Sequence, residues 1–124
     1  MSDVTFKQVS DKIQKHLEER DWHNNASRSL AISVALEAAE LLEHYQWDDE
    51  PVGGKDDIAS ELADILIYIF QIAHAYDIDL PDAITKKLAV AAKKYPAKNF
   101  KGKGLKERNE AWYKDKLRHK KSGL

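Results

Sequence analysis

Two pairs of carboxylates with matching spacing stand out in this sequence. Glu37 and Glu40 lie in the apolar stretch ISVALEAAELLEHY, and Glu61 and Asp64 lie in the apolar stretch DDIASELADILIYIFQIAHAY. Residues three apart on a helix project from one face, so each pair would present its two carboxylates together. A loop containing Pro and Gly joins the two stretches. We therefore expect two antiparallel helices whose four carboxylates meet across the groove between them.

A cluster of this kind needs a compensating charge. Like charges repel strongly where the effective dielectric is low, and a divalent cation relieves the repulsion. Hard ions such as Mg²⁺ take carboxylate oxygens from more than one helix. A single Glu-x-x-Glu is more often a solvated helix face, whereas two pairs on neighbouring apolar helices leave a metal site and a solvated face equally open.

The composition is that of one globular domain without disulfides. The chain has 124 residues, a formal net charge of −1 and no cysteine, so a thiolate metal site is excluded. The polar start MSDVTFKQVSDK does not resemble a signal peptide, and the most apolar run, residues 65–75, is too short to span a bilayer. We expect a cytoplasmic protein with no membrane partner.

The small net charge conceals an uneven distribution. Residues 1–92 carry 8 basic and 18 acidic side chains, a balance of −10, whereas residues 93–124 carry 12 basic and 3 acidic ones, a balance of +9. The basic segment lacks the interleaved aromatic residues of single-strand binders, so we expect no nucleic acid partner. We expect a helical domain over residues 1–96 and a basic, partly helical extension over residues 97–124.

Hydrophobic periodicity predicts helices and no strand. The expected helices cover residues 5–20, 27–47, 56–76 and 79–95, with a weaker one over residues 105–118. The fold class is therefore all-α, an antiparallel four-helix bundle. The third helix is apolar almost all round between residues 65 and 72, which predicts burial against a second copy and hence a homo-oligomer.

The wider sequence resembles the MazG-like all-α nucleoside triphosphate pyrophosphohydrolases, and within them the dCTP pyrophosphatase branch. The resemblance rests on the two acid pairs, 20 residues apart, and on the segments ERDW, LEAAELLEHYQW, ELADILIYIFQIAHAYDIDLPDAITKKL and KKYP. It covers about residues 6–96. It implies hydrolysis of a (d)NTP, with dCTP the best candidate, to (d)NMP and pyrophosphate in nucleotide-pool house-cleaning. It also implies a homo-oligomer, a dimer or a tetramer, with sites near the subunit interface.

The resemblance also assigns roles to individual residues. Glu37, Glu40, Glu61 and Asp64 would hold Mg²⁺ or Mn²⁺, with Glu37 and Glu40 also catalytic and Glu40 preferred for positioning or deprotonating the water. Trp22 and Trp47 would form the base platform, and both are expected to flank one end of the groove. The further substrate-binding candidates are Tyr68 for the sugar, Arg28, Lys87 and Lys94 for phosphate charge, and Tyr95 in the Lys-Tyr-Pro segment.

The sequence departs from the family pattern at two places. Arg28-Ser29-Leu30 stands where the family often has Arg-Asn-Leu, and Ala91 stands where an Asn is common near the nucleotide. The Ala91 departure leaves a sugar or phosphate contact unassigned.

Two other classes of protein also carry acidic residues on apolar helices. Di-iron carboxylate bundles need Glu-x-x-His motifs, and neither acid pair has a histidine at that spacing. A non-enzymatic helical module with a basic tail remains an alternative. Stabilisation by Mg²⁺ or Mn²⁺ would distinguish a metal site from a solvated acidic face.

Overall fold

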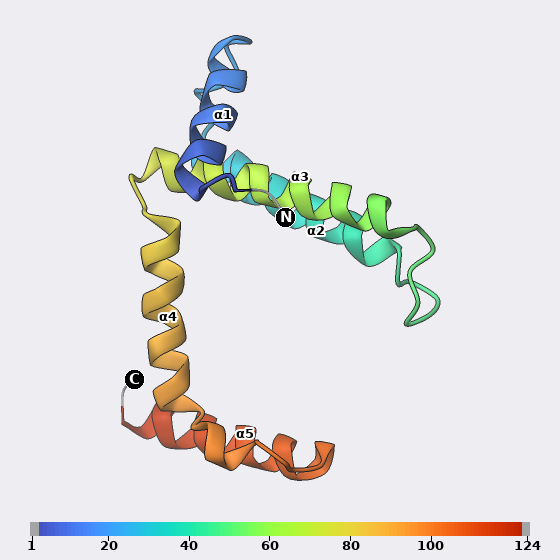
Figure 1. Cartoon of the computed structure of the whole chain (residues 1–124), viewed down its shortest axis with the longest axis vertical. Helices are drawn as coiled ribbons and strands as arrows, with labels where there is room; N and C mark the ends of the chain where they lie inside the picture. The colour runs from blue at the N-terminus through green and yellow to red at the C-terminus, as the bar shows by residue number, and fades with distance from the viewer. Residues whose placement is uncertain (1–2, 123–124) are drawn as a thin grey trace. The chain divides into compact units, whose positions relative to one another are not determined.

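The computed structural model of this chain describes residues 3–122, and over that range it is entirely helical. The elements are α1 (Phe6–Glu18), α2 (Ser27–Glu43), α3 (Lys55–Ala75), α4 (Leu80–Lys94), a 3₁₀ turn η1 (Ala97–Asn99) and α5 (Leu105–Lys121) (Figure 1). They form two compact units, one reaching to Asp79 and one starting at Leu80. The all-α prediction is confirmed for the described residues, while the boundary expected after residue 96 stays a prediction.

The first unit is built on the antiparallel pair of α2 and α3, which run alongside each other (Figure 1). Helix α1 packs on α3, where Phe6 stacks on Phe70 with 5.9 Å between ring centroids. Leu17, Leu30 and Phe70 are buried and supply one core side chain from each helix. Because α2 and α3 are held together in this way, side chains in the middle of the two helices face one another.

The end of α1 fixes the position of Trp22. Asp21 has a φ of 56°, in the left-handed region. The backbone N–H of Trp22 donates to the carbonyl of Leu17 at 2.9 Å, and that of Asp21 donates to the carbonyl of Glu18 at 3.2 Å, which together make a Schellman motif. Asn25 Nδ2 also donates to the Trp22 carbonyl at 3.0 Å. The indole is therefore attached to a closely hydrogen-bonded turn.

The C-terminal end of α2 differs from the sequence-based expectation. The helix begins at Ser27, as expected, and Ala26 occupies the N-cap without a side-chain hydrogen bond. The helix was expected to reach residue 47, but it ends at Glu43. The carbonyl of His44 instead accepts the backbone N–H of Val52 at 2.8 Å, which closes the loop back on the helix end. This long-range hydrogen bond leaves no signal in local hydrophobic periodicity.

The second unit contains α4, η1 and α5. Asp115 of α5 is only 2% exposed, and it accepts hydrogen bonds from Asn99 Nδ2, the shorter one 3.1 Å long. Arg118 Nη2 lies 2.8 Å from its other carboxylate oxygen. Since a buried carboxylate must be paired, these contacts tie η1 to α5. The weaker helix expected from residue 105 is thereby confirmed, and it extends to Lys121.

Large apolar side chains remain exposed on each of the five α-helices of the described residues. Examples are Phe6 on α1, Ile32 and Leu36 on α2, Leu62 and Leu66 on α3, Ile84 and Leu88 on α4, and Leu105 and Leu117 on α5. By length and composition, α3 would also be able to cross a membrane. However, Asp64 lies near its middle, and a carboxylate at the centre of a bilayer is costly. The exposed faces are better suited to packing against further helices.

Candidate active site

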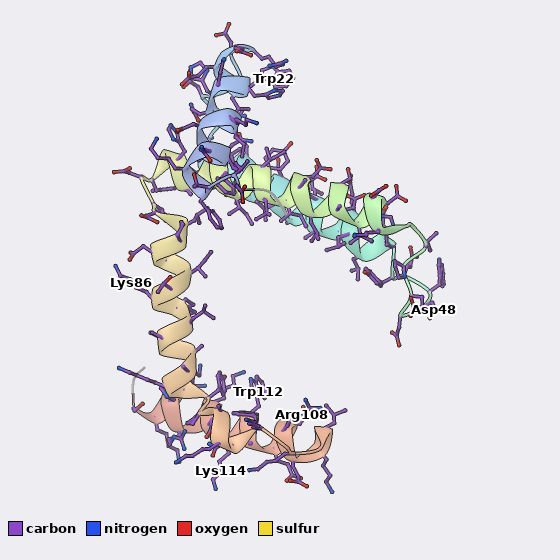
Figure 2. All side chains as sticks on the ribbon, in the orientation of Figure 1. Trp22, Asp48, Lys86, Arg108, Trp112 and Lys114 are labelled. Atoms are coloured by element: carbon purple, nitrogen blue, oxygen red, sulfur yellow. The ribbon has the colours of Figure 1, made fainter. Side chains whose placement is uncertain are left out.

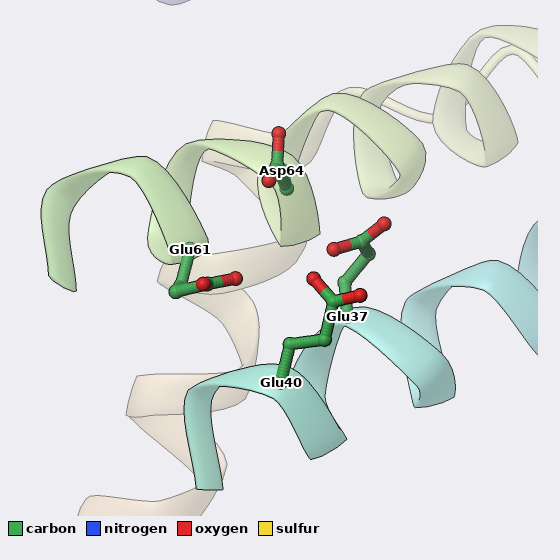
Figure 3. Close-up of side chains that lie close together, drawn as sticks. All are labelled: Glu37, Glu40, Glu61 and Asp64. Atoms are coloured by element: carbon green, nitrogen blue, oxygen red, sulfur yellow. The ribbon is translucent and has the colours of Figure 1, made fainter. Parts of the chain in front are cut away.

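Four carboxylates converge in the groove between α2 and α3. Glu37 and Glu40 project from α2 toward Glu61 and Asp64 of α3 (Figure 3). One oxygen of each side chain lies within 4.8 Å of the corresponding oxygens of the other three. The convergence predicted from the two spacings is therefore confirmed, and the groove presents an all-oxygen set of potential metal ligands.

Two oxygens of this cluster lack any protein partner. Glu37 Oε2 and Glu61 Oε2 are both buried without a hydrogen bond. A buried carboxylate oxygen in this state is destabilising unless a cation or another donor satisfies it. An all-oxygen donor set suits a hard divalent cation such as Mg²⁺ or Mn²⁺ better than a soft one. The residues present thus fit the kind of ion that the sequence predicts.

The crowding of charge also changes the protonation of Glu37. The hydrogen bond with Glu40 raises the pKa of Glu37, and burial and the negative charges of Glu40, Asp64 and Glu61 raise it further. A hydrogen bond between two carboxyl groups requires that one of them carry a proton. Without a cation, the cluster therefore holds a proton more tightly than an isolated glutamate does.

The raised pKa of Glu37 predicts a pH-dependent stability of the metal-free protein. Stability from this group is complete below the ordinary glutamate pKa of 4.5 and is lost as the pH rises through the higher folded-state pKa. Glu37→Gln carries no charge, so in EDTA at pH 7 we expect it to melt a few degrees above the wild type.

Thermal melts in EDTA from about pH 4 to pH 7 would measure this difference. Glu43→Gln is a matched control, because Glu43 is an exposed residue at the end of the same helix. We expect the gap between Glu37→Gln and the wild type to widen with pH, whereas the control follows the wild type. A difference in melting temperature that stays constant with pH would contradict the raised pKa of Glu37.

His44 contacts the cluster from outside. Its Nε2 lies 3.5 Å from Glu61 Oε1, and its Nδ1 accepts the backbone N–H of Gly53 at 3.1 Å. In a neutral imidazole, a nitrogen that accepts a hydrogen bond carries no proton, so the ring proton is on Nε2 and faces Glu61. The loop before α3 therefore sets the tautomer of a ring that orients one carboxylate of the cluster.

A pocket of about 600 Å³ adjoins the cluster within the first unit. Glu37, Glu40 and Asp64 form part of its lining, and Trp22 and Tyr68 line it as well. The structure thus brings together five residues that were singled out from the sequence. Their carboxylates and aromatic rings share one cavity, which suits a ligand with both a charged and a planar part.

Four further polar residues of this pocket were not identified from the sequence. They are Lys12, His16, Asn25 and Gln71. The His16 and Trp22 rings meet edge to face, with 6.3 Å between centroids. Gln71 is seven residues, about two helical turns, beyond Asp64 and lies on the same face of α3 as Tyr68. Extending this face by one turn past Tyr68 would have identified Gln71 from the sequence.

The two tryptophans are not together in one chain. Trp22 precedes α2 and Trp47 follows it, and a helix of 17 residues is about 25 Å long. Figure 2 shows Trp22 at one end of the first unit and Asp48, the neighbour of Trp47, in the loop at the other end. Trp47 is 85% exposed and is not part of the pocket lining. The expectation that both flank one end of the groove is therefore wrong within a single chain.

The remaining candidates lie away from the pocket lining or in the second unit. Arg28 is in the first turn of α2 and is exposed. Lys87 and Lys94 belong to α4, and Lys94 Nζ lies 5.4 Å from the centroid of the neighbouring Tyr95 ring. Their roles in substrate binding stay predictions.

Comparisons with known proteins bear on this geometry. The model of the MazG-like family matches residues 32–115, which include all four carboxylates and more than half of the chain. The chain belongs to the MazG-like family. The matched range also continues past residue 96, beyond the extent inferred from the sequence motifs.

Curated relatives and a solved structure support the assignment to the MazG-like family. Bovine dCTP pyrophosphatase 1 is 30% identical over 114 residues, covering 85% of this chain and 68% of that protein. The human dCTP pyrophosphatase 1 is 32% identical over 88 residues, covering 64% of this chain and 52% of its own length. The matches thus span about half to two thirds of these relatives. A pyrophosphatase from Archaeoglobus fulgidus has a TM-score of 0.63 at 25% identity, covering 77% of this chain and 96% of that one.

Proposed function

We propose that this MazG-like protein is a divalent-cation-dependent nucleoside triphosphate pyrophosphohydrolase. It would convert a (d)NTP, with dCTP the best candidate, to (d)NMP and pyrophosphate in nucleotide-pool house-cleaning. One observation carries the proposal: a four-carboxylate cluster with two unpartnered buried oxygens adjoins a pocket that is also lined by Trp22. The names of the relatives, dCTP pyrophosphatase 1 and pyrophosphatase, support the same reaction.

The carboxylates would serve the phosphate end of the substrate. Glu37, Glu40, Glu61 and Asp64 would hold Mg²⁺ or Mn²⁺, and a bound cation would polarise phosphate oxygens and offset their charge. Glu40, the most exposed of the four, would position a water in line with the α-phosphorus and accept its proton. As the water oxygen bonds to the α-phosphorus, the bond to the oxygen bridging to the β-phosphate breaks and pyrophosphate leaves.

The rest of the pocket would hold the nucleoside. Trp22 offers a planar surface for a base, and stacking of a base on an aromatic ring contributes about 1–3 kcal/mol. Tyr68 lies between the carboxylates and the far end of the same α3 face, a position that suits a sugar hydroxyl. Lys12, which lines the same pocket, adds a positive charge for the phosphates to the candidates Arg28, Lys87 and Lys94.

The proposal includes a four-helix bundle that assembles into a homo-oligomer in the cytoplasm. Exposed apolar side chains on three different helices support the oligomer. Leu36, Leu62 and Leu88 are 62%, 47% and 64% exposed. Folded proteins cover apolar surface of this extent with further helices. In such an assembly Trp47 would reach a nucleotide only from another copy. Gel filtration at the mass of one chain, 14.2 kDa, would refute the oligomer.

Pyrophosphate release from a panel of dNTPs and NTPs tests the proposed reaction. With Mg²⁺ we expect equal amounts of pyrophosphate and NMP, with dCTP or another pyrimidine deoxynucleotide the best substrate, and no product in EDTA. Hydrolysis of none of the panel, together with no stabilisation by Mn²⁺, would refute the proposal and leave the non-enzymatic module. Release of orthophosphate instead of pyrophosphate would move the cleaved bond away from the α-phosphorus.

A further inference from the structure

Gln71 of α3 carries an amide that has no hydrogen-bond partner in the protein, although its atoms are not fully enclosed. The residue is 9% exposed, and within residues 3–122 no hydrogen bond engages its side chain. The residue nevertheless lines the pocket beside the carboxylate cluster. Its direct neighbours in sequence, Phe70 and Ile72, are apolar, and Phe70 belongs to the core. Gln71 is thus a polar residue within an apolar stretch of α3.

The amide atoms of Gln71 are not fully enclosed, so solvent in the pocket reaches them when no ligand is bound. Native structures pair nearly all polar groups at such positions with protein, water or a bound molecule. Since the side chain opens on a cavity of about 600 Å³, a molecule in that cavity is able to supply the missing donor and acceptor. Gln71 is therefore placed to contact a ligand in this cavity.

The position of Gln71 along α3 indicates which part of the ligand it meets. Asp64, Tyr68 and Gln71 lie on one helical face, and seven residues at 1.5 Å each separate the first from the last by about 10 Å. If the phosphates are at Asp64, the sugar is near Tyr68 and the base extends toward Gln71. Trp22 and His16, also in the lining, supply the flat surface beside it.

We propose that Gln71 hydrogen-bonds the Watson–Crick edge of the base and is a specificity-determining residue of this site. The inference rests on the proposed function. An amide presents a donor and an acceptor side by side, which complements the adjacent acceptor N3 and donor N4 of cytosine. The same amide turned over complements uracil or thymine, so Gln71 favours a ligand with a hydrogen-bonding base edge over a ligand that has no base.

Calorimetric binding of dCMP, dTMP, dAMP, dGMP and deoxyribose 5-phosphate tests this proposal, with KM and kcat for the matching triphosphates. The variant Gln71→Met keeps the size of the side chain and removes both polar groups. We expect it to weaken binding of the preferred dNMP about tenfold, raise KM by a similar factor and leave deoxyribose 5-phosphate binding unchanged. Mn²⁺ should stabilise both proteins equally.

Two other variants complete the design. Gln14→Met is the matched control, because Gln14 is a half-buried amide on α1 that donates to Glu18 at 3.2 Å and does not line the pocket. It should behave like the wild type throughout. Gln71→Glu replaces the donor with a second acceptor, so it should shift preference toward dGMP, whose base edge offers the two adjacent donors N1–H and N2–H, and away from dTMP.

The outcomes separate this inference from the proposed function. If the wild type hydrolyses triphosphates and Gln71→Met keeps the same base preference, the inference is overturned while the function stands. If no triphosphate is hydrolysed but dNMP binding loses its base preference in Gln71→Met, the inference stands and the function fails. A wild type that binds no nucleotide, or binds all five ligands equally, overturns the role of Gln71.

Discussion

Replacing Glu40 with Gln should lower kcat/KM for pyrophosphate release by about 10³-fold and abolish stabilisation by Mn²⁺. The substitution keeps the shape of the side chain but removes one of four charges whose oxygens lie within 4.8 Å of one another. A bound cation supplies several kcal/mol of transition-state stabilisation, and each 1.36 kcal/mol corresponds to a factor of ten in rate. Loss of the proposed proton acceptor would act on kcat in addition.

The stability measurement makes this prediction independent of any assay substrate. At a Mn²⁺ concentration of 100 times its Kd, binding to one folded-state site stabilises a protein by about 2.7 kcal/mol, an increase in Tm of roughly 10 °C. We expect this increase in the wild type and in Glu43→Gln, whose exposed carboxylate lies outside the cluster. If Glu40→Gln retained the full increase, Glu40 would not be a ligand.

Replacing Gly53 with Ala should weaken Mn²⁺ binding by 10- to 100-fold without removing any ligand. A Cβ at this position would lie 2.5 Å from His44 Cε1, 2.6 Å from His44 Nδ1 and 2.8 Å from the Cβ of Asp57. Since these distances are too short for real contacts, the imidazole must move away. The Gly53 hydrogen bond to Nδ1 is then lost, and Nε2 no longer faces Glu61. Losses of this size are typical when a group that orients a metal ligand is disturbed.

Gly54→Ala is the matched control, because a Cβ there would have its nearest neighbour at 4.0 Å, an ordinary contact. Titration with Mn²⁺ followed by electron paramagnetic resonance would give Kd for both variants and for His44→Ala. The double variant Gly53→Ala/His44→Ala should lose much less than the sum of the two single losses, since removing the ring removes two of the three close approaches and leaves only the one to the Cβ of Asp57. Additive losses in the double variant would show that Gly53 acts on the loop and not through the ring.

The sequence by itself determined the helices and the carboxylate cluster. Apolar residues at helical spacing mark α1 to α5, and the two acid pairs each lie on one face because residues three apart share that face. Residues 44–54 connect α2 directly to α3, and the two neighbouring helices pack antiparallel, so the four carboxylates meet. These features depend on local periodicity and on one direct connection, and both are readable along the chain.

Only the tertiary structure decided the remaining parts of the site. The early end of α2 and the orientation of Glu61 depend on contacts between His44 and residues eight or more positions away. The pocket combines Lys12 of α1 with Gln71 of α3, and no spacing rule relates the two. Trp22 and Trp47 are each plausible base platforms by residue type, yet α2 separates them. Periodicity specifies which face of a helix a side chain occupies, but the crossing of separate helices decides which faces share a cavity.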